Sequence, residues 1–322
     1  MVEFGYALSS EEHTPNNLVK YARQAEQSGF TFALISDHYH PWIGDQGHSP
    51  FVWSVIGGIA QATENLQLGT GVTCPTIRIH PAIIAQAAAT AAAMMPGRFF
   101  LGVGTGENLN EHVVGEGWPP HDLRLPMLEE AVEILRALWK GDTVTFWGDY
   151  YVVEDARLFT LPEEAPPIMV AASGPKTLAA AGKIGDGLIS LAPKEDALKR
   201  FKEAGGEHKP CYGQITVCWA QSEKEARETV HKLWPISGLT GEISRELRTV
   251  AHFEQAVKML SMEQTTEKVI CGPDPQAHVD GIRKFVDAGY DHIYVHQIGP
   301  QQEEFMRFYA QEVLPQVKNS SG

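Results

Sequence analysis

The feature that most constrains this chain is a regular alternation of short apolar runs with longer helix-like runs. Eight such pairs follow one another along the 322 residues. The apolar runs are almost continuously hydrophobic, which is typical of parallel strands that are covered on both faces. We expect strands at 4–8, 32–36, 66–73, 99–103, 168–172, 187–191, 214–219 and 292–296, followed by helices at 15–28, 51–63, 81–95, 126–139, 176–183, 194–204, 223–233 and 301–317.

Eight strand–helix pairs predict an α/β fold in which the strands close into a (β/α)8 TIM barrel. An open, doubly wound sheet is the main alternative. Two segments interrupt the alternation: an insertion at about 143–166 follows the fourth pair, and one at about 235–266 follows the seventh. We expect a hairpin in the first and a helix from Ala251 to Met262 in the second. No long linker divides the chain, so we expect a single barrel domain over residues 1–322.

Charge and cysteine content argue against several classes of protein. The chain has 26 basic and 40 acidic residues, a net charge of −14, so we expect neither nucleic acid nor an anionic membrane as a partner. No apolar run approaches the roughly 20 residues that span a bilayer. The first residues lack the basic and apolar regions of a signal peptide. The cysteines form no Cys-x-x-Cys pair, so we expect buried free thiols and a cytoplasmic location. They are Cys74, Cys211, Cys218 and Cys271.

Ionisable and aromatic side chains follow the second expected strand. Residues 36–42 contain Asp37, His38 and Trp42, and the carboxyl ends of the strands are where an α/β barrel places its chemistry. Glu107 follows the fourth expected strand. His38 and Glu107 are candidates for proton donor and acceptor, and Trp42 could form a flat wall. Each has a plainer explanation, since His38 could be an ordinary loop histidine and Glu107 a carboxylate in the first turn of a helix.

Small residues end several other expected strands, which would let a planar cofactor approach the backbone closely. The run Gly-Val-Gly-Thr-Gly at 102–106 is only weakly similar to a dinucleotide-binding fingerprint. His38 and His40 have the spacing with which many barrel hydrolases hold a metal, but the later strand ends offer only His296 as a further histidine. We therefore expect no metal. The strand-end residues are Gly71, Val72, Thr105, Gly106, Ala171, Ala172, Ser173 and Gly174.

Three stretches together resemble a known family. Residues 36–42 (Ser-Asp-His-Tyr-His-Pro-Trp), 101–111 and 148–151 (Gly-Asp-Tyr-Tyr) are similar to the luciferase-like oxidoreductases that use the deazaflavin coenzyme F420. The likeness is closest to the F420-dependent glucose-6-phosphate dehydrogenase group. The F420-dependent secondary alcohol dehydrogenases share the Asp-His…Pro-Trp and Gly-Glu signatures. This resemblance implies a (β/α)8 barrel, coenzyme F420 in the barrel mouth, and pairing as a homodimer.

The resemblance also implies which residues bind the cofactor. The aspartate after the second strand would contact the deazaflavin. The end of the third strand would form a bulge, often with a non-proline cis peptide bond, and residues 171–174 would contact the phosphate and ribityl groups. The implied cofactor-binding residues are Asp37, Gly71, Val72, Thr105, Gly106, Asn110, Ala171, Ala172, Ser173 and Gly174.

On the substrate side, the resemblance implies hydride transfer from an alcohol carbon to F420. His38 would be the base that takes the hydroxyl proton, and Glu107 would protonate the reduced cofactor, although the two roles could be exchanged. Trp42 would position the substrate, with Glu11 nearby. The resemblance therefore implies coenzyme F420 as the cofactor and a small-molecule alcohol or sugar phosphate as the substrate.

The chain departs from the sugar-phosphate members where they bind phosphate. Lys194 matches their lysine after the sixth strand, and Lys268 replaces an arginine. Their Lys-His pair in the late insertion is missing, because Ile243 and Ser244 stand there, with Arg245 and Arg248 just beyond. A dianionic phosphate favours several charged donors. We expect a sugar phosphate such as glucose 6-phosphate, with a neutral secondary alcohol or ketone as the alternative. An FMN-dependent luciferase-like monooxygenase and a non-catalytic deazaflavin carrier are further alternatives.

Overall fold

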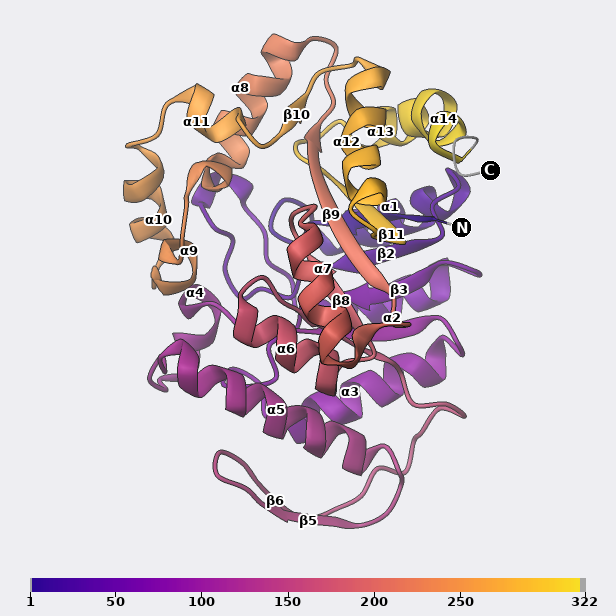
Figure 1. Ribbon diagram of the computed structural model, residues 1–322, viewed down its shortest axis with the longest axis vertical. Helices are drawn as coiled ribbons and strands as arrows, with labels where there is room; N and C mark the ends of the chain where they lie inside the picture. Colours follow the sequence, from indigo (N-terminus) through magenta and orange to yellow (C-terminus); the bar gives the residue numbers. More distant parts are fainter. Residues whose placement is uncertain (1, 319–322) are drawn as a thin grey trace.

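The computed structural model describes residues 2–318, and its centre is a closed barrel of eight parallel strands (Figure 1). Each barrel strand pairs in parallel with the next, and β8 pairs with β9 to close the ring. The two-residue strand β10 (Ile270–Cys271) adds to the carboxyl end of β9. The barrel strands are β1 (Glu3–Leu8), β2 (Phe32–Ile35), β3 (Gln67–Thr70), β4 (Phe99–Val103), β7 (Ile168–Ala171), β8 (Gly187–Ser190), β9 (Cys211–Cys218) and β11 (His292–Gln297).

Helices surround the barrel, and local capping signals define where several of them begin. The hydroxyl of Thr14 accepts the Asn17 N–H before α1, and Ser222 accepts the Glu225 N–H before α8. The helices are α1 (Pro15–Gln27), α2 (Val52–Ala62), α3 (Pro81–Met94), α4 (Asn108–Glu111), α5 (His121–Leu138), α6 (Pro175–Ile184), α7 (Glu195–Phe201), α8 (Glu223–Leu233), α9 (Ile243–Glu246), α10 (Val250–Val257), α11 (Met262–Thr266), α12 (Pro275–Asp287), α13 (Gln302–Phe308) and α14 (Leu314–Lys318).

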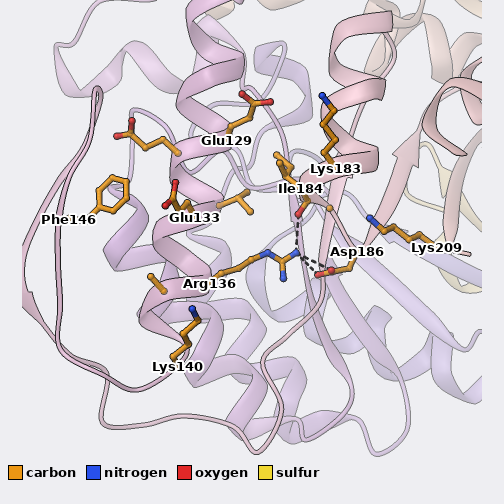
Figure 2. Close-up of a pocket in the computed structure, with 13 residues that line it drawn as sticks. Glu129, Glu133, Arg136, Lys140, Phe146, Lys183, Ile184, Asp186 and Lys209 are labelled. Carbon is orange, nitrogen blue, oxygen red and sulfur yellow. Dashed lines mark hydrogen bonds and ion pairs between the residues drawn. The ribbon is translucent and has the colours of Figure 1, made fainter. Parts of the chain in front are cut away.

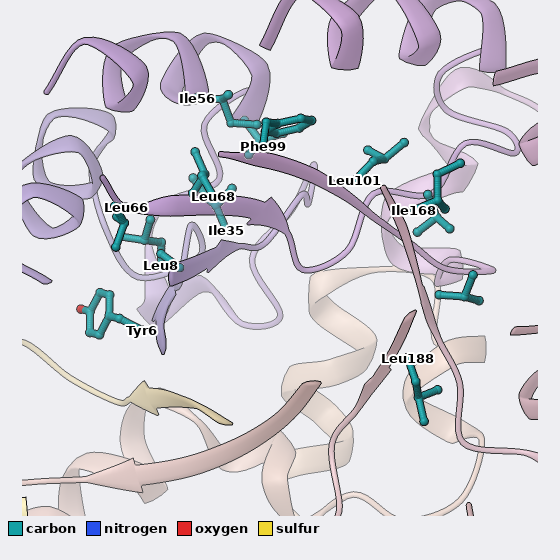
Figure 3. Packing of buried hydrophobic residues seen from close by; sticks show 14 of the residues in the cluster. Tyr6, Leu8, Ile35, Ile56, Leu66, Leu68, Phe99, Leu101, Ile168 and Leu188 are labelled. Atoms are coloured by element: carbon teal, nitrogen blue, oxygen red, sulfur yellow. The ribbon is translucent and has the colours of Figure 1, made fainter. Parts of the chain in front are cut away.

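Two apolar layers stabilise the barrel. The outer layer joins strands to helices, and Figure 3 shows Leu68 and Phe99 of neighbouring strands near Ile56 of α2. The inner layer fills the barrel, so its interior is a packed core and its mouth is where such a fold places a site. The inner cluster consists of Phe32, Leu34, Phe100, Met169, Ile189, Tyr212 and Tyr294.

The two insertions follow the fourth and seventh strand–helix pairs, as the sequence predicted. The first contains an antiparallel hairpin of β5 (Val144–Trp147) and β6 (Val152–Ala156), which lies outside the barrel next to α5 (Figure 1). The second contains α9, α10 and α11. The predicted helix 251–262 is wrong in its extent: α10 ends at Val257, and the hydroxyl of Ser261 caps a separate helix α11.

Two further helix predictions are corrected. Helix α5 begins at His121 instead of residue 126, because Pro126 is accommodated inside the helix although proline is usually a helix boundary. The prediction also missed α12. The signals for α12 were present, since the carboxylate of Asp274 accepts the Gln276 N–H and Pro275 begins the helix, while Gly289 follows it with φ of 96°.

None of the helices in the described part of the chain is both long and apolar enough to cross a membrane. The four cysteines are free thiols, as predicted. Cys74, Cys211 and Cys218 are buried, whereas Cys271 is partly exposed because it lies in the edge strand β10.

Candidate active site

His38 lies between two carboxylates at the end of β2. Its Nδ1 atom is 2.8 Å from Oε1 of Glu11, which follows β1, and its Nε2 atom is 3.9 Å from Oε2 of Glu107, which follows β4. Glu11 is buried, and its Oε2 atom accepts hydrogen bonds from the hydroxyls of Ser9 at 3.0 Å and Ser36 at 2.7 Å. The side chain of Glu107 is 32% exposed. The histidine therefore lies between a buried carboxylate and an accessible one.

The charge state of His38 follows from these neighbours. Burial alone lowers the pKa of a histidine, because it disfavours the imidazolium. Here the Glu11 carboxylate, helped by Glu107 and Asp37, outweighs burial and raises the pKa of His38 from 6.5 to about 9. Burial raises the pKa of Glu11, but His38 and the Ser36 hydroxyl hold it well below its usual range. At neutral pH His38 is therefore an imidazolium with a proton to donate.

Asp37 belongs to a second network, beside His38. Its Oδ2 atom accepts a hydrogen bond from the Thr73 hydroxyl at 2.8 Å, and its Oδ1 atom accepts one from Nη2 of Arg78 at 2.7 Å. Nε of Arg78 lies 3.6 Å from Glu111, which also accepts the Arg78 backbone N–H at 2.8 Å. Burial raises the pKa of Glu111 to about 7, although Arg78 opposes this rise. The network ties together the loops after β2, β3 and β4.

Asn110 of α4 fixes the loop that carries His38. Its Oδ1 atom accepts the backbone N–H groups of Tyr39 at 2.9 Å and His40 at 3.1 Å. Its Nδ2 atom is buried and has no hydrogen-bond partner among residues 2–318. Buried donors are nearly always paired in folded proteins, so this amide group is a candidate ligand contact.

The two histidines of the His-x-His sequence have different surroundings. His38 faces its two carboxylates, whereas Nδ1 of His40 lies 3.0 Å from the carbonyl oxygen of Leu109 and its ring stacks near His112. Across residues 2–318, no three or more His, Cys, Asp or Glu side chains are grouped so that they could hold a metal ion. The two carboxylates beside His38 are possible partners for proton exchange.

Small residues from three neighbouring strand ends form a cradle beside His38. Gly71 and Val72, after β3, are joined by a cis peptide bond, in agreement with the resemblance. A Cβ atom on Gly104, after β4, would lie 2.8 Å from Cγ2 of Val72 and 3.7 Å from Cβ of Ala171 at the end of β7. Val72 and Ala171 rest on the inner barrel cluster. Such a surface suits a flat ring that lies against the backbone.

The predicted cofactor loops continue from this cradle. Thr105 and Gly106 lead to the glutamate after β4, and Gly106 has φ of 77° with the sulfur of Cys74 only 2.5 Å from where its Cβ would be. Ala172 is buried, whereas Ser173 is exposed and precedes Gly174, the N-cap of α6. These positions lie at the mouth; their contacts with a cofactor stay a prediction.

Trp42 links the site to the second insertion. Its ring meets His38 edge to face at 5.0 Å between centroids, and it meets Phe253 of α10 at 5.2 Å. Phe253 is fully buried. The insertion therefore forms an apolar wall beside Trp42. The residues of this apolar cluster are Trp42, Ile43, Leu109, Ile236, Leu239, Leu247, Val250, Phe253 and Val257.

The structure gives less support to an assembled phosphate pocket. Lys194 occupies the N-cap position of α7, after β8, and is exposed; Lys268 is exposed between α11 and β10. Neither forms an ion pair within the described residues. Arg245 of α9 does reach the mouth, where its Nη2 atom donates to Oγ of Ser173 at 3.1 Å. Phosphate binding by these residues stays a prediction.

A cavity of about 800 Å³ lies elsewhere, between α5 and α6 on the outside of the barrel (Figure 2). Charged side chains line it, and Arg136 lies across it, donating to Asp186 at 2.9 Å and to the Ile184 carbonyl at 2.9 Å. None of the predicted site residues lines this cavity. We therefore place the candidate active site at the barrel mouth and not here.

Arg78 and Glu246 are among the residues around the site that the sequence analysis did not single out. Arg78 joins Asp37 to Glu111, and the signal was a basic residue between Ile77 and Ile79 just after a strand end. Glu246, described below, joins the second insertion to α5, and no local pattern marks it.

The closed barrel with ionisable residues at its mouth defines a TIM-barrel enzyme. Residues 1–292 match the model of a family described as luciferase-like monooxygenase. The chain belongs to this family.

The chain is also similar to named relatives and to solved structures. The chain is 36% identical over 329 residues to the F420-dependent glucose-6-phosphate dehydrogenase of Microbacterium testaceum (strain StLB037), covering 98% of each protein. It is 36% identical over 334 residues to that of Intrasporangium calvum, covering 99% of each. Among solved structures, an F420-dependent secondary alcohol dehydrogenase in complex with an F420–acetone adduct matches with a TM-score of 0.91 and 29% identity, over 98% of this chain and 99% of that one.

A more distant structure shares the fold alone. The coenzyme F420-dependent tetrahydromethanopterin reductase from Methanopyrus kandleri matches with a TM-score of 0.80 and 23% identity, over 98% of this chain and 99% of that one. The predicted luciferase-like (β/α)8 barrel is thus confirmed by both the strand pairing and the comparisons.

Proposed function

We propose that this protein is a coenzyme F420-dependent dehydrogenase that transfers a hydride between an alcohol carbon and F420. The observation that carries the proposal is His38, held between Glu11 and Glu107 beside a cradle of small residues. The relatives at 36% identity and the structure at a TM-score of 0.91 are F420-dependent dehydrogenases by name, which supports both cofactor and reaction type.

The residues at the mouth fit this cofactor. Gly104 has no side chain and packs closely against Val72 and Ala171, so a flat ring would lie against small residues there, and the unpaired Nδ2 of Asn110 offers a donor to a polar ring edge. The exposed Ser173 would hold the side chain of the cofactor at the start of α6. When bound there, F420 supplies or accepts the hydride.

The protein's own residues would manage the protons. As an imidazolium, His38 donates a proton to a carbonyl oxygen; in the oxidative direction the neutral ring must accept the hydroxyl proton. Glu11 fixes the ring and stabilises its charged form. Glu107 is accessible and 3.9 Å away, so we assign it proton transfer on the cofactor side. Trp42 limits where the reacting carbon can lie.

For the substrate, we propose a sugar phosphate such as glucose 6-phosphate. The names of the relatives support it, and Lys194 and Arg245 place positive charge near the mouth. A neutral secondary alcohol or ketone is the second candidate, favoured by the apolar wall that Phe253 and its neighbours build against Trp42.

Glu107→Gln tests the catalytic part of this proposal. We expect kcat to fall about 10²- to 10⁴-fold, the usual contribution of a general acid or base, while F420 binding, measured by fluorescence titration, changes little. If the protein is a non-catalytic carrier, the wild type and Glu107→Gln will bind F420 equally and neither will turn over an alcohol. If kcat is unchanged in Glu107→Gln, Glu107 has no role in the mechanism.

A further inference from the structure

Helix α9, in the second insertion, is fastened to the barrel by two consecutive charged residues. Arg245 donates to Ser173 at the start of α6, and Glu246 pairs with Arg124 of α5. Figure 1 shows α9 beside α4, and the two helices are in contact. A four-residue helix cannot hold its position by its own hydrogen bonds, so these contacts set where it lies.

The contact between Glu246 and Arg124 involves a buried guanidinium. The Arg124 side chain is 2% exposed, and Oε1 of Glu246 accepts hydrogen bonds from its Nη1 and Nη2 atoms at 3.2 and 3.3 Å. Glu246 is its only ion-pair partner within the described chain. Trp118 covers the guanidinium at 4.0 Å from the ring centroid and donates its indole N–H to Oε2 of Glu246 at 3.0 Å. Because a buried charge needs a partner, Arg124 favours the docked position of α9.

The docked helix touches both sides of the candidate active site. The backbone carbonyl of Glu246 accepts a hydrogen bond from Nδ2 of Asn108 at 3.0 Å, and Asn108 directly follows Glu107. Leu247, the next residue of the insertion, belongs to the apolar cluster that contains Trp42. Glu246 is thus connected to Glu107 through Asn108, and to Trp42 through the apolar cluster that contains Leu247.

We propose that Glu246 is a positioning residue of the active site, which docks α9 on Arg124, Trp118 and Asn108 and thereby holds Glu107 and Trp42 in place around His38. The effect on turnover rests on the proposed function. The docking of α9 does not, so it can be tested without substrate.

The variant Glu246→Gln removes the charge and keeps the size of the side chain. Glu242→Gln is its matched control, because Glu242 is exposed, precedes the same helix and makes no side-chain capping bond. We expect Glu246→Gln to lower kcat about 10- to 100-fold, with the substrate KM and the F420 Kd little changed, since misplacement of reacting groups costs this much. Limited proteolysis should also cut residues 237–249 faster, and Glu242→Gln should match the wild type in both assays.

Two further variants separate positioning from simple loss of stability. Trp118→Phe keeps a ring over Arg124 but removes the donor to Glu246, so we expect a smaller fall in kcat in the same direction. In an Arg124→Met background, adding Glu246→Gln should change kcat little, because the two side chains act as a pair. If Arg124→Met does not fold, the comparison of Glu246→Gln with Glu242→Gln decides alone.

The outcomes are distinct. Faster cleavage with wild-type kcat in Glu246→Gln would overturn the positioning role, and unchanged cleavage with unchanged kcat would overturn the docking as well. If the wild type turns over no alcohol with F420, the proposed function fails, while faster cleavage of Glu246→Gln would still support docking of α9 by Glu246.

Discussion

At the scale of single residues, the decisive feature is one histidine with two unequal carboxylates. Glu11 is buried and lies 2.8 Å from Nδ1 of His38, whereas Glu107 is accessible. Two carboxylates in different environments take different roles in proton transfer. Glu11 therefore sets the charge of His38, and Glu107 is free to exchange protons.

This arrangement predicts the pH dependence of both directions. Because the pKa of His38 is raised to about 9, the neutral ring that alcohol oxidation requires forms only as the pH rises, so kcat for oxidation should increase up to about pH 9. Carbonyl reduction should fall over the same range. In Glu11→Gln the inflection of both profiles should move down toward 6.5. Identical inflections in the two proteins would contradict the role of Glu11.

The raised pKa of His38 also makes the free energy of unfolding depend on pH. The folded pKa of His38 lies above its unfolded value of 6.5, so the ion pair with Glu11 stabilises the fold fully below pH 6.5. This contribution is lost as the pH rises through about 9. Urea denaturation should therefore show the unfolding free energies of wild type and His38→Asn converging from about pH 6 to pH 10. A constant difference would contradict the ion pair.

At the scale of elements, the ends of β3, β4 and β7 form the cradle. Gly104→Ala adds a Cβ 2.8 Å from Val72, so we expect about tenfold weaker F420 binding and about 1–3 kcal/mol of lost stability. Gly117→Ala is the control, because its Cβ would have no atom within 4 Å. Fluorescence titration and urea denaturation measure the two effects. Equal F420 affinity in both variants would place the ring elsewhere.

Element by element, the sequence predicted the barrel because a buried parallel strand is recognisable from its continuous apolar run, as at 99–103. It predicted that His38 and Glu107 meet because both follow barrel strands. It could not predict Arg78 or Glu246, whose partners depend on side-chain directions across segments far apart in the chain. It missed α12 because the alternation of strands and helices gave no separate place to a helix after β10.

At the scale of the whole molecule, the resemblance implies a homodimer, and we keep this as a proposal. A groove of about 300 Å³ between α2 and α3 is lined by apolar side chains, of which Phe51, Ile83 and Met94 are markedly exposed. Light scattering should give about twice 35.4 kDa, and Ile83→Glu should shift the mass toward the monomer. A wild-type monomer at high protein concentration would contradict the proposal.

The most direct test of the central claim follows the visible absorbance of oxidised F420 mixed with the enzyme and single substrates: glucose 6-phosphate, other sugar phosphates, free sugars and simple secondary alcohols. We predict bleaching with at least one of them, and its loss in Glu107→Gln. Bleaching only with phosphorylated sugars would support a phosphate pocket around Lys194, and bleaching only with neutral alcohols would support the second candidate substrate. Failure to bind F420, in a protein that purifies with a yellow flavin instead, would contradict the proposed function.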